Sequence, residues 1–294
     1  MEFVETPVDN ETTPVQTPTK KTRGLLFKLI RMTLTVYVGV CAVLFFTQRS
    51  MIYPGAPAPQ SNPSERGWAF ETFQLPVSGG ITEGWYVPAP NARGTVLFSH
   101  GNAENMGNTL DTIKVFRNLG FNVVQFDYGG YGNSTGKPSE TRCYNDVRAV
   151  WNWVLQQKGE TPSRMILVGQ SLGGAVIAQL ASETTPAAVI LESTFTSMVD
   201  MARENLPFLP VYLLTLDRFQ NLNKLSKIHA PILIVHTPED FVVGYKHGQR
   251  LFEKANAPKT FLKLHGPHCG AYYWENKDYV KGITTFLDGV LTTF

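Results

Sequence analysis

Cysteine is scarce in this chain, with three residues, Cys41, Cys143 and Cys269, among 294. No Cys-x-x-Cys pair occurs, and no two histidines have the i, i+4 spacing around a glutamate that a helical zinc site needs. We therefore expect no disulfide scaffold, no metal and no cofactor, although the sequence leaves a single Cys143–Cys269 bridge open. Cys41 lies in an apolar run, where packing or lipid contact is expected and S-acylation is the alternative.

Dense stripes of basic residues and internal repeats are also missing. The net charge is only +2, and Lys and Arg form a cluster only near the start of the chain, so nucleic acid is not expected as a partner. Hydrophobic residues make up 43% of the 294 positions, enough for the core of one large α/β domain with an appendage. The oligomeric state does not follow from the sequence.

The N-terminal part divides into a tail and an apolar run. Residues 1–24 hold Thr, Pro, Glu and Asp and end in basic residues, which predicts a flexible tail. Residues 25–47 are interrupted only by Lys28 and Arg31. As a helix this run is about 34 Å long, enough for a hydrocarbon layer of about 30 Å. We expect a membrane anchor; a cleaved signal peptide and a peripheral amphipathic helix are the alternatives, and the bulky residues from Leu44 onward disfavour cleavage.

The flanking charges predict how this anchor is oriented. Five cations precede or open the apolar run, whereas Arg49 alone follows closely. The positive-inside rule then leaves the N-terminus cytoplasmic and places the body of the protein on the opposite side of the membrane.

The remaining chain predicts a linker and one α/β domain. Residues 48–67 are rich in proline and form the expected linker, and residues 68–294 form the domain. A hairpin is expected over 70–87, followed by strands and helices that alternate, which is typical of a mostly parallel sheet with helices on both faces. The expected core strands are 95–98, 121–126, 165–168, 188–191, 231–236 and 261–264.

The stretch 165–178 predicts a nucleophile. Met165 to Val168 form a buried strand, Gly169-Gln170-Ser171-Leu172-Gly173 follows, and a helix is expected over 175–180. A serine on such a strand-to-helix turn exposes its hydroxyl only if the flanking glycines lack side chains. An ordinary glycine-rich loop is the alternative.

A serine nucleophile needs a histidine base and a carboxylate that orients it, in the chain order Ser, acid, His on this type of fold. Asp240 follows the strand 231–236 and is the expected acid, with Glu239 as the alternative. His268 follows the last strand and is the expected base, with His265 as the alternative.

Two backbone N–H groups should form the oxyanion hole. Leu172, directly after the serine, is one expected donor, and Asn102, in the tight turn after the strand 95–98, is the other. His100 precedes Ser171, in the wrong order for a base, so we expect it to support its loop by hydrogen bonds. His236 also ends a core strand and competes for the role of base.

Three blocks together resemble the membrane-anchored abhydrolase-domain serine hydrolases of the α/β-hydrolase superfamily, a subgroup that includes protein depalmitoylases. The resemblance covers about residues 50–290. The blocks are Phe98-Ser99-His100-Gly101-Asn102, Asp127-Tyr128-Gly129-Gly130-Tyr131-Gly132-Asn133-Ser134-Thr135-Gly136-Lys137-Pro138-Ser139-Glu140 and Gly169-Gln170-Ser171-Leu172-Gly173-Gly174.

The resemblance implies an α/β-hydrolase fold with Ser171, Asp240 and His268 at the triad positions and a small helical cap at about 195–229. The apolar stretch 206–216 would either line an acyl-chain site or pack the cap onto the domain. We expect hydrolysis of esters or thioesters with hydrophobic acyl groups, from small-molecule or lipid substrates. A serine peptidase and a non-catalytic binding module tethered to the membrane are the alternatives.

Overall fold

A computed structural model describes residues 20–270, 272 and 275–291 of the chain. Most of the predicted tail, residues 1–19, lies outside the described residues. The chain divides into two compact units, Met1–Leu44 and Phe45–Phe294. In the first, helix α1 (Lys20–Ile52) begins, and its stretch Gly24–Ile52 is long and apolar enough to cross a membrane by length and composition. A signal sequence meets the same criterion.

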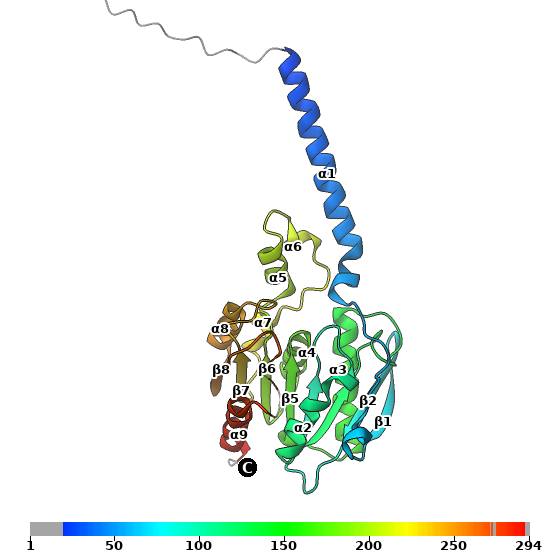
Figure 1. Cartoon of the computed structure of the whole chain (residues 1–294), viewed down its shortest axis with the longest axis vertical. Helices are drawn as coiled ribbons and strands as arrows, with labels where there is room; N and C mark the ends of the chain where they lie inside the picture. Colours follow the sequence, from blue (N-terminus) through cyan, green and yellow to red (C-terminus); the bar gives the residue numbers. More distant parts are fainter. Residues whose placement is uncertain (1–19, 271, 273–274, 292–294) are drawn as a thin grey trace, which may run out of the picture. The chain divides into compact units, whose positions relative to one another are not determined.

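The second unit contains one eight-stranded sheet in the order β1-β2-β4-β3-β5-β6-β7-β8 (Figure 1). β1 and β2 form the expected hairpin, β2 pairs antiparallel with β4, and the neighbours from β4 to β8 are all parallel. The strands are β1 (Glu71–Val77), β2 (Gly80–Val87), β3 (Thr95–Ser99), β4 (Asn122–Phe126), β5 (Met165–Gln170), β6 (Ala188–Glu192), β7 (Ile232–His236) and β8 (Lys259–Lys263).

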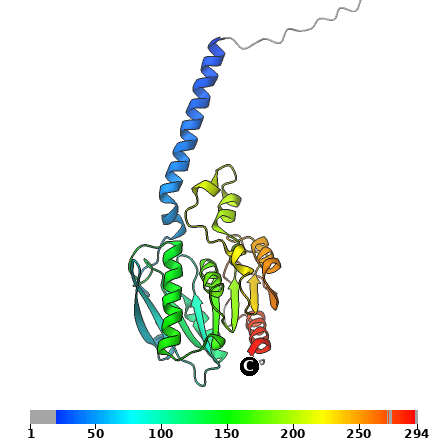
Figure 2. The same cartoon turned by 180° about the vertical axis from the view of Figure 1, so that it is seen from behind.

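Helices cover both faces of the sheet, as predicted. The α-helices after α1 are α2 (Leu110–Asn118), α3 (Glu140–Gln157), α4 (Leu172–Ala181), α5 (Met198–Asn205), α6 (Val211–Leu214), α7 (Asn221–Leu225), α8 (Tyr245–Lys254) and α9 (Lys277–Leu291). α2 and α9 share one core with the sheet, and α3, α4 and α8 share the other. α2 lies in front of the sheet in Figure 1, and α3 comes to the front in the reverse view (Figure 2).

Local sequence explains these elements well. The Ser139 hydroxyl caps α3 by accepting a hydrogen bond from the Arg142 N–H at 3.1 Å. The predicted apolar face of α3 is buried, from Tyr144 through Val154. The strands β3, β4, β6 and β7 are buried at every position, which is typical of parallel strands covered on both sides.

Two elements differ from their predicted bounds. α4 begins at Leu172, three positions before the expected start, because the Gly174 N–H already donates to the Ser171 carbonyl at 3.1 Å. α1 continues through Ile52 into the stretch predicted as a linker, and Tyr53 directly after it is buried at 5% exposure. The stretch that follows contains a short 3-10 helix, Pro63–Arg66.

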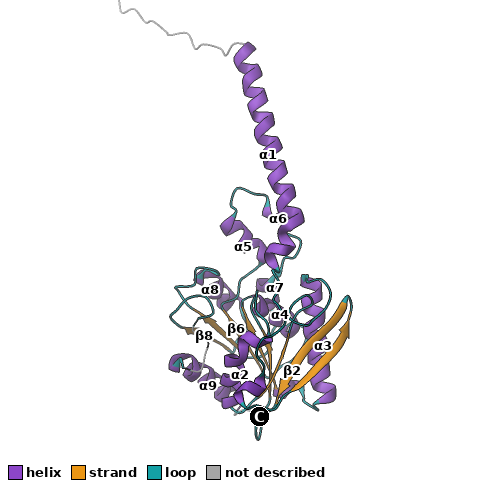
Figure 3. Cartoon of the chain, turned by 45° about the vertical axis from the view of Figure 1, so that its right-hand side comes forward, coloured by secondary structure: helices purple, strands orange, loops and turns teal. Residues whose placement is uncertain are grey.

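The predicted cap region holds three short helices. α5, α6 and α7 lie between β6 and β7, separated by irregular segments (Figure 3). The Asn221 side-chain amide donates to the Phe195 carbonyl at 2.8 Å, and the Met198 N–H donates to the Arg218 carbonyl, also at 2.8 Å. The start and the end of the region are therefore tied to each other.

Candidate active site

Ser171 occupies a strained turn between β5 and α4. Its backbone has φ +53° and ψ −114°, a conformation that side-chain-bearing residues rarely adopt. A Cβ added to Gly169 would lie 2.4 Å from the Gly173 carbonyl oxygen, and one added to Gly173 would lie 1.9 Å from the Ser99 carbonyl oxygen. Both glycines are therefore required by close backbone approach, as the sequence predicts.

His268 lies between Ser171 and Asp240. Its Nε2 is 3.1 Å from the Ser171 Oγ, and its Nδ1 is 2.7 Å from the Asp240 Oδ2. An Nδ1–H donated to the carboxylate leaves the Nε2 lone pair facing the serine hydroxyl. The structure thus brings the three residues together in one hydrogen-bonded chain, although they come from loops after β5, β7 and β8.

Asp240 is held as an anion by the turn that follows β7. Its Oδ1 accepts hydrogen bonds from the N–H groups of Val242 at 2.9 Å and Val243 at 2.8 Å. Burial raises the pKa of this carboxyl, but the hydrogen bonds from His268 and the two N–H groups outweigh it and leave the pKa below its usual value. An ionised Asp240 can both orient His268 and stabilise its protonated form.

The alternative acid and base lie elsewhere. Glu239 pairs with His265, Oε1 to Nδ1, at 2.9 Å, and both side chains are exposed. Ser171 is hydrogen-bonded to His268 and not to His265. The structure therefore distinguishes the two candidate bases, His268 and His265, and the two candidate acids, Asp240 and Glu239. The two alternatives form a surface pair of their own.

His236 is buried beneath Asp240. Its Nε2 lies 2.8 Å from the Val243 carbonyl oxygen and 3.5 Å from the Asp240 Oδ2. Burial lowers the pKa of His236, so the neutral ring donates its Nε2–H to Val243. His236 therefore supports the acid loop and does not reach the serine.

The two expected oxyanion donors border the serine. Leu172 is the first residue of α4, where a backbone N–H has no partner within the helix. Asn102 and Leu172 both line a cavity of about 230 Å³ together with Ser171. The Tyr131 hydroxyl donates to the Asn102 Oδ1 at 2.7 Å, and the Gly101 N–H before it donates to Glu104 at 3.0 Å, so the loop carrying Asn102 is held on both sides.

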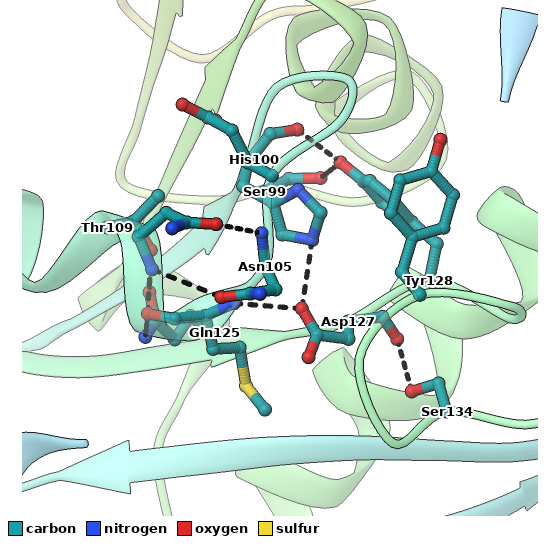
Figure 4. Close-up of polar contacts among 12 residues, drawn as sticks. Ser99, His100, Asn105, Thr109, Gln125, Asp127, Tyr128 and Ser134 are labelled. Atoms are coloured by element: carbon teal, nitrogen blue, oxygen red, sulfur yellow. Dashed lines mark hydrogen bonds and ion pairs between the residues drawn. The ribbon is translucent and has the colours of Figure 1, made fainter. Parts of the chain in front are cut away.

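A second network lies behind this loop (Figure 4). The His100 Nδ1–H donates to the Gly101 carbonyl at 2.8 Å, while Nε2 lies 3.3 Å from the Asp127 Oδ1 in an ion-pair contact. The Tyr128 hydroxyl donates to the His100 carbonyl at 2.6 Å, and the Met106 N–H donates to Asp127 at 2.9 Å. His100 supports its loop, as expected. Its partner Asp127 was not predicted, although both residues directly follow neighbouring parallel strands.

Glu192 is a further buried carboxyl that the sequence did not reveal. Its backbone carbonyl accepts the Ser171 N–H at 2.8 Å, and its Oε1 accepts the Tyr279 hydroxyl at 2.6 Å. Burial raises the pKa of Glu192 to about 7, although the Tyr279 hydrogen bond lowers it, and the Glu192 Oε2 has no hydrogen-bond partner among the described residues. The carboxyl links α9 to the strand end beside the serine.

Cysteine pairing and cavity size add two constraints. Cys41, Cys143 and Cys269 are all free, so the bridge that the sequence left open does not form.

A groove between β8 and α9 has a volume of about 840 Å³, larger than that of the cavity beside Ser171, but none of Ser171, Asp240 and His268 lines it. The chemical groups, and not the volume of a hollow, locate the candidate site.

Comparisons with known proteins give one family model and several relatives. A family model described as serine aminopeptidase, S33, matches residues 90–220. An uncharacterized protein of Mycobacterium tuberculosis H37Rv is 32% identical over 254 residues, covering 84% of this chain and 88% of that protein. The human alpha/beta hydrolase domain-containing protein 17B is 38% identical over 179 residues, which is 60% of this chain and 61% of the relative.

Solved structures share the fold at low sequence identity. An esterase of Pyrococcus furiosus superposes with a TM-score of 0.66 at 18% identity, covering 80% of this chain and 99% of the esterase. Est1E of Butyrivibrio proteoclasticus, solved with ferulic acid, gives a TM-score of 0.62 at 17% identity, covering 75% and 99%. These structural neighbours show that the chain has the α/β-hydrolase fold, and its residues 90–220 match the model of the family described as serine aminopeptidase, S33. By its likeness to the M. tuberculosis protein over most of both chains, the chain belongs to the same family as that protein.

Proposed function

We propose that this protein is a membrane-anchored serine hydrolase that cleaves carboxylic esters or thioesters with hydrophobic acyl groups. The observation that carries the proposal is the hydrogen-bonded chain from the Ser171 Oγ to His268 Nε2, 3.1 Å, and from His268 Nδ1 to Asp240, 2.7 Å. A serine hydroxyl is a weak nucleophile at neutral pH and gains reactivity when such a base accepts its proton.

In the proposed mechanism Ser171 attacks the acyl carbonyl while His268 takes its proton. The negative charge on the carbonyl oxygen is stabilised by the N–H groups of Leu172 and Asn102, each worth about a hundredfold to a thousandfold in rate. His268 then protonates the leaving alcohol or thiol, and an acyl-enzyme forms on Ser171. Water, deprotonated by His268, releases the acid, and Asp240 holds the ring throughout.

The lining of the cavity supports a hydrophobic acyl group. Beyond Ser171 and Asn102, its walls are apolar side chains from the end of α1, the start of the cap and the acid loop: Met51, Ile52, Leu172, Phe195, Met198, Met201, Val242 and Val243. An acyl chain placed there loses contact with water at little polar cost. The structural neighbours that share the fold include an esterase of P. furiosus and Est1E with bound ferulic acid.

Probe labelling tests the catalytic proposal. A fluorophosphonate should label the wild-type chain and fail to label Ser171→Ala, whereas the exposed-serine control Ser163→Ala should label normally. Absence of labelling in the wild type would favour the non-catalytic binding module, whereas equal labelling of Ser171→Ala would place the reactive nucleophile at another residue.

A substrate panel tests the acyl proposal. Short and long acyl esters, thioesters and peptide amides are compared by kcat/KM in the full chain. We expect esters or thioesters to exceed peptide amides; the description of the matched family as a serine aminopeptidase makes the peptidase the second candidate, and preferred cleavage of amides would establish it instead.

The anchor and its orientation belong to the same proposal. The apolar stretch Gly24–Ile52 supports anchoring, and the excess of cations before it supports a cytoplasmic N-terminus. Resistance to carbonate extraction tests the anchor. Protease digestion of sealed vesicles tests the side on which residues 68–294 lie, and digestion of that region from the cytoplasmic face would reverse the orientation.

A further inference from the structure

The tip of the cap carries large apolar side chains that are exposed on its surface. Phe208 is 88% exposed and Leu213 is 75% exposed, and Tyr212 and Leu216 are also exposed. We call these four residues the apolar cap tip. The stretch 206–216 that contains them has no charged residue. A soluble surface rarely leaves several large apolar side chains uncovered on one charge-free segment, so this surface indicates a binding partner.

The cap tip is tied to the last turns of α1. The Gln48 side-chain amide donates to the Leu214 carbonyl at 3.0 Å, and its oxygen accepts the Leu216 N–H at 2.8 Å. The Arg49 Nε lies 3.1 Å from the Asp217 carboxylate, whose side chain is only 7% exposed. These bonds bridge about 166 to 168 positions of sequence, and they hold the cap segment against the end of an apolar helix.

The same turns of α1 expose apolar groups of their own. Phe46 and Met51 are exposed, on either side of the residues that bind the cap. Met51 also lines the cavity that contains Ser171, opposite Val242 of the acid loop. An apolar surface thus adjoins the mouth of the candidate active site.

We propose that the apolar cap tip inserts into the surface of a lipid bilayer, the one that α1 enters, and so presents the Ser171 cavity to acyl groups leaving that bilayer. The partner follows from continuity: Gln48 and Arg49 belong to the same helix as the candidate membrane span, and the cap is bonded to them. Aromatic side chains with a polar edge, such as Tyr212, favour the interface between headgroups and acyl chains.

Charge at the tip fits an interfacial position. The Arg218 guanidinium lies 4.5 Å from the centre of the Tyr212 ring and donates to the Tyr212 carbonyl at 3.1 Å. A cation therefore lies beside the aromatic ring of the tip, where it can pair with a lipid phosphate. Asp217, which precedes Arg218 in the sequence, is paired with Arg49. The apolar tip can therefore present the Arg218 cation to a lipid surface while the neighbouring carboxylate is paired.

This inference rests on the proposed membrane anchor, and photo-cross-linking separates the two. Benzoylphenylalanine replaces Phe208 or Leu213 in the full chain, which is reconstituted in phosphatidylcholine vesicles and irradiated. The matched control is Gln156, an exposed residue in the last turn of α3, where the chain turns back into the amino end of β5. Mass spectrometry then identifies what is attached at each position.

Lipid adducts at positions 208 and 213, with little or none at 156, are the expected result. Adducts with a second copy of the chain, or lipid labelling equal at all three positions, would overturn docking while leaving the anchor intact. Loss of the chain from the vesicles on carbonate extraction would overturn both.

A functional readout gives an independent check. In Phe208→Asp with Leu213→Asp, the rate on a lipid ester embedded in the vesicles should fall at least tenfold relative to the rate on a short soluble ester. Gln156→Asp is the control and should leave this ratio unchanged. An unchanged ratio in the double variant would show that the tip does not govern access from the bilayer.

Discussion

Two histidine–aspartate pairs lie at the carboxyl edge of one sheet and differ in what their free nitrogen meets. His268 gives Nδ1 to Asp240 and points Nε2 at the Ser171 hydroxyl. His100 gives Nδ1 to the Gly101 carbonyl and turns Nε2 to Asp127, with the ring 1% exposed. In the first pair one imidazole nitrogen faces the serine and can accept its proton. In the second pair both imidazole nitrogens contact buried protein groups, so the ring supports its loop.

The difference teaches that position after a core strand is not enough to identify a catalytic histidine. The residues of both pairs follow core strands: His100 follows β3 and Asp127 follows β4, while Asp240 and His268 lie in the loops after β7 and β8. What distinguishes His268 is its position in the loop after β8, five residues beyond the strand end at Lys263, where its side chain is 18% exposed beside Ser171. A catalytic base needs such access, because its proton partner changes during the reaction.

Asp240→Asn should have the largest effect, on activity. An amide at this position no longer fixes the tautomer of His268 or stabilises its protonated form, so kcat should fall roughly ten-thousandfold. Glu239→Gln is the matched control and should retain kcat within a few-fold. Steady-state kinetics on a soluble ester measure both, and the reverse pattern would assign the acid to Glu239.

Asp127→Asn should act mainly on stability. Breaking a buried charge pair costs about 3 kcal/mol of unfolding free energy, and kcat of the folded fraction should fall far less than in Asp240→Asn. Burial lowers the pKa of His100, but the Asp127 carboxylate outweighs it, so the folded pKa is raised. The pairing therefore stabilises fully below the unfolded pKa, about 6.5, and the stabilisation is lost as the pH rises through the higher folded pKa.

Urea unfolding of the full chain in detergent micelles measures this difference at several pH values. The gap between wild type and Asp127→Asn should be widest below about pH 6 and narrow as the pH rises. A gap that widens with rising pH, or a kcat loss equal to that of Asp240→Asn, would show that the two pairs are equivalent.

Glu192→Gln should remove a pH dependence of the free energy of unfolding. Burial raises the pKa of Glu192 from 4.5 to about 7, so the wild type loses stability as the pH rises from its unfolded pKa through its folded pKa. The change amounts to roughly 3 kcal/mol at most, since one pKa unit corresponds to about 1.4 kcal/mol. Relative to Glu192→Gln, wild type should weaken between about pH 4.5 and pH 7 in urea titrations. Parallel curves would show that the carboxyl is not buried as described.

Tyr131→Phe should have the smallest effect. It removes the hydroxyl that donates to the Asn102 side chain at 2.7 Å and leaves the ring packed near His100. A lost hydrogen bond of this kind costs about 1 kcal/mol, so kcat should fall by less than about tenfold while KM changes little. A change in KM with kcat unchanged would place Tyr131 in substrate binding and not behind the oxyanion loop.

Features set by neighbouring residues were predictable. The glycine spacing around Ser171 predicts a tight strand-to-helix turn, because the steric conflict arises within a few residues of the serine and at the adjacent strand. The cap of α3 by Ser139 and its buried face follow from local pattern in the same way. The parallel sheet, too, follows from the alternation of strands and helices.

Features set by contacts between distant segments were not predictable. Glu239 and Asp240 are neighbours in sequence, and the hydrogen bond from the Asp240 N–H to the Thr237 carbonyl, 3.2 Å, belongs to the turn that separates their side chains. The role of Asp127 depends on β4 lying beside β3, and that of Glu192 on α9 returning to the sheet. The stretch predicted as a linker begins inside α1, where Gln48 and Arg49 bind the cap.

The sequence alone determined a serine on a glycine-flanked turn, an acid and a histidine in the right order, an α/β sheet and an apolar N-terminal helix, since each follows from residues close together in the chain. The tertiary structure decided which carboxylate and which imidazole face that serine, which histidine is closed off, and that the cap is bonded to the end of the helix. Those outcomes depend on how loops from separate strands come together in space, and the spacing of residues along the chain does not give the distances between such loops.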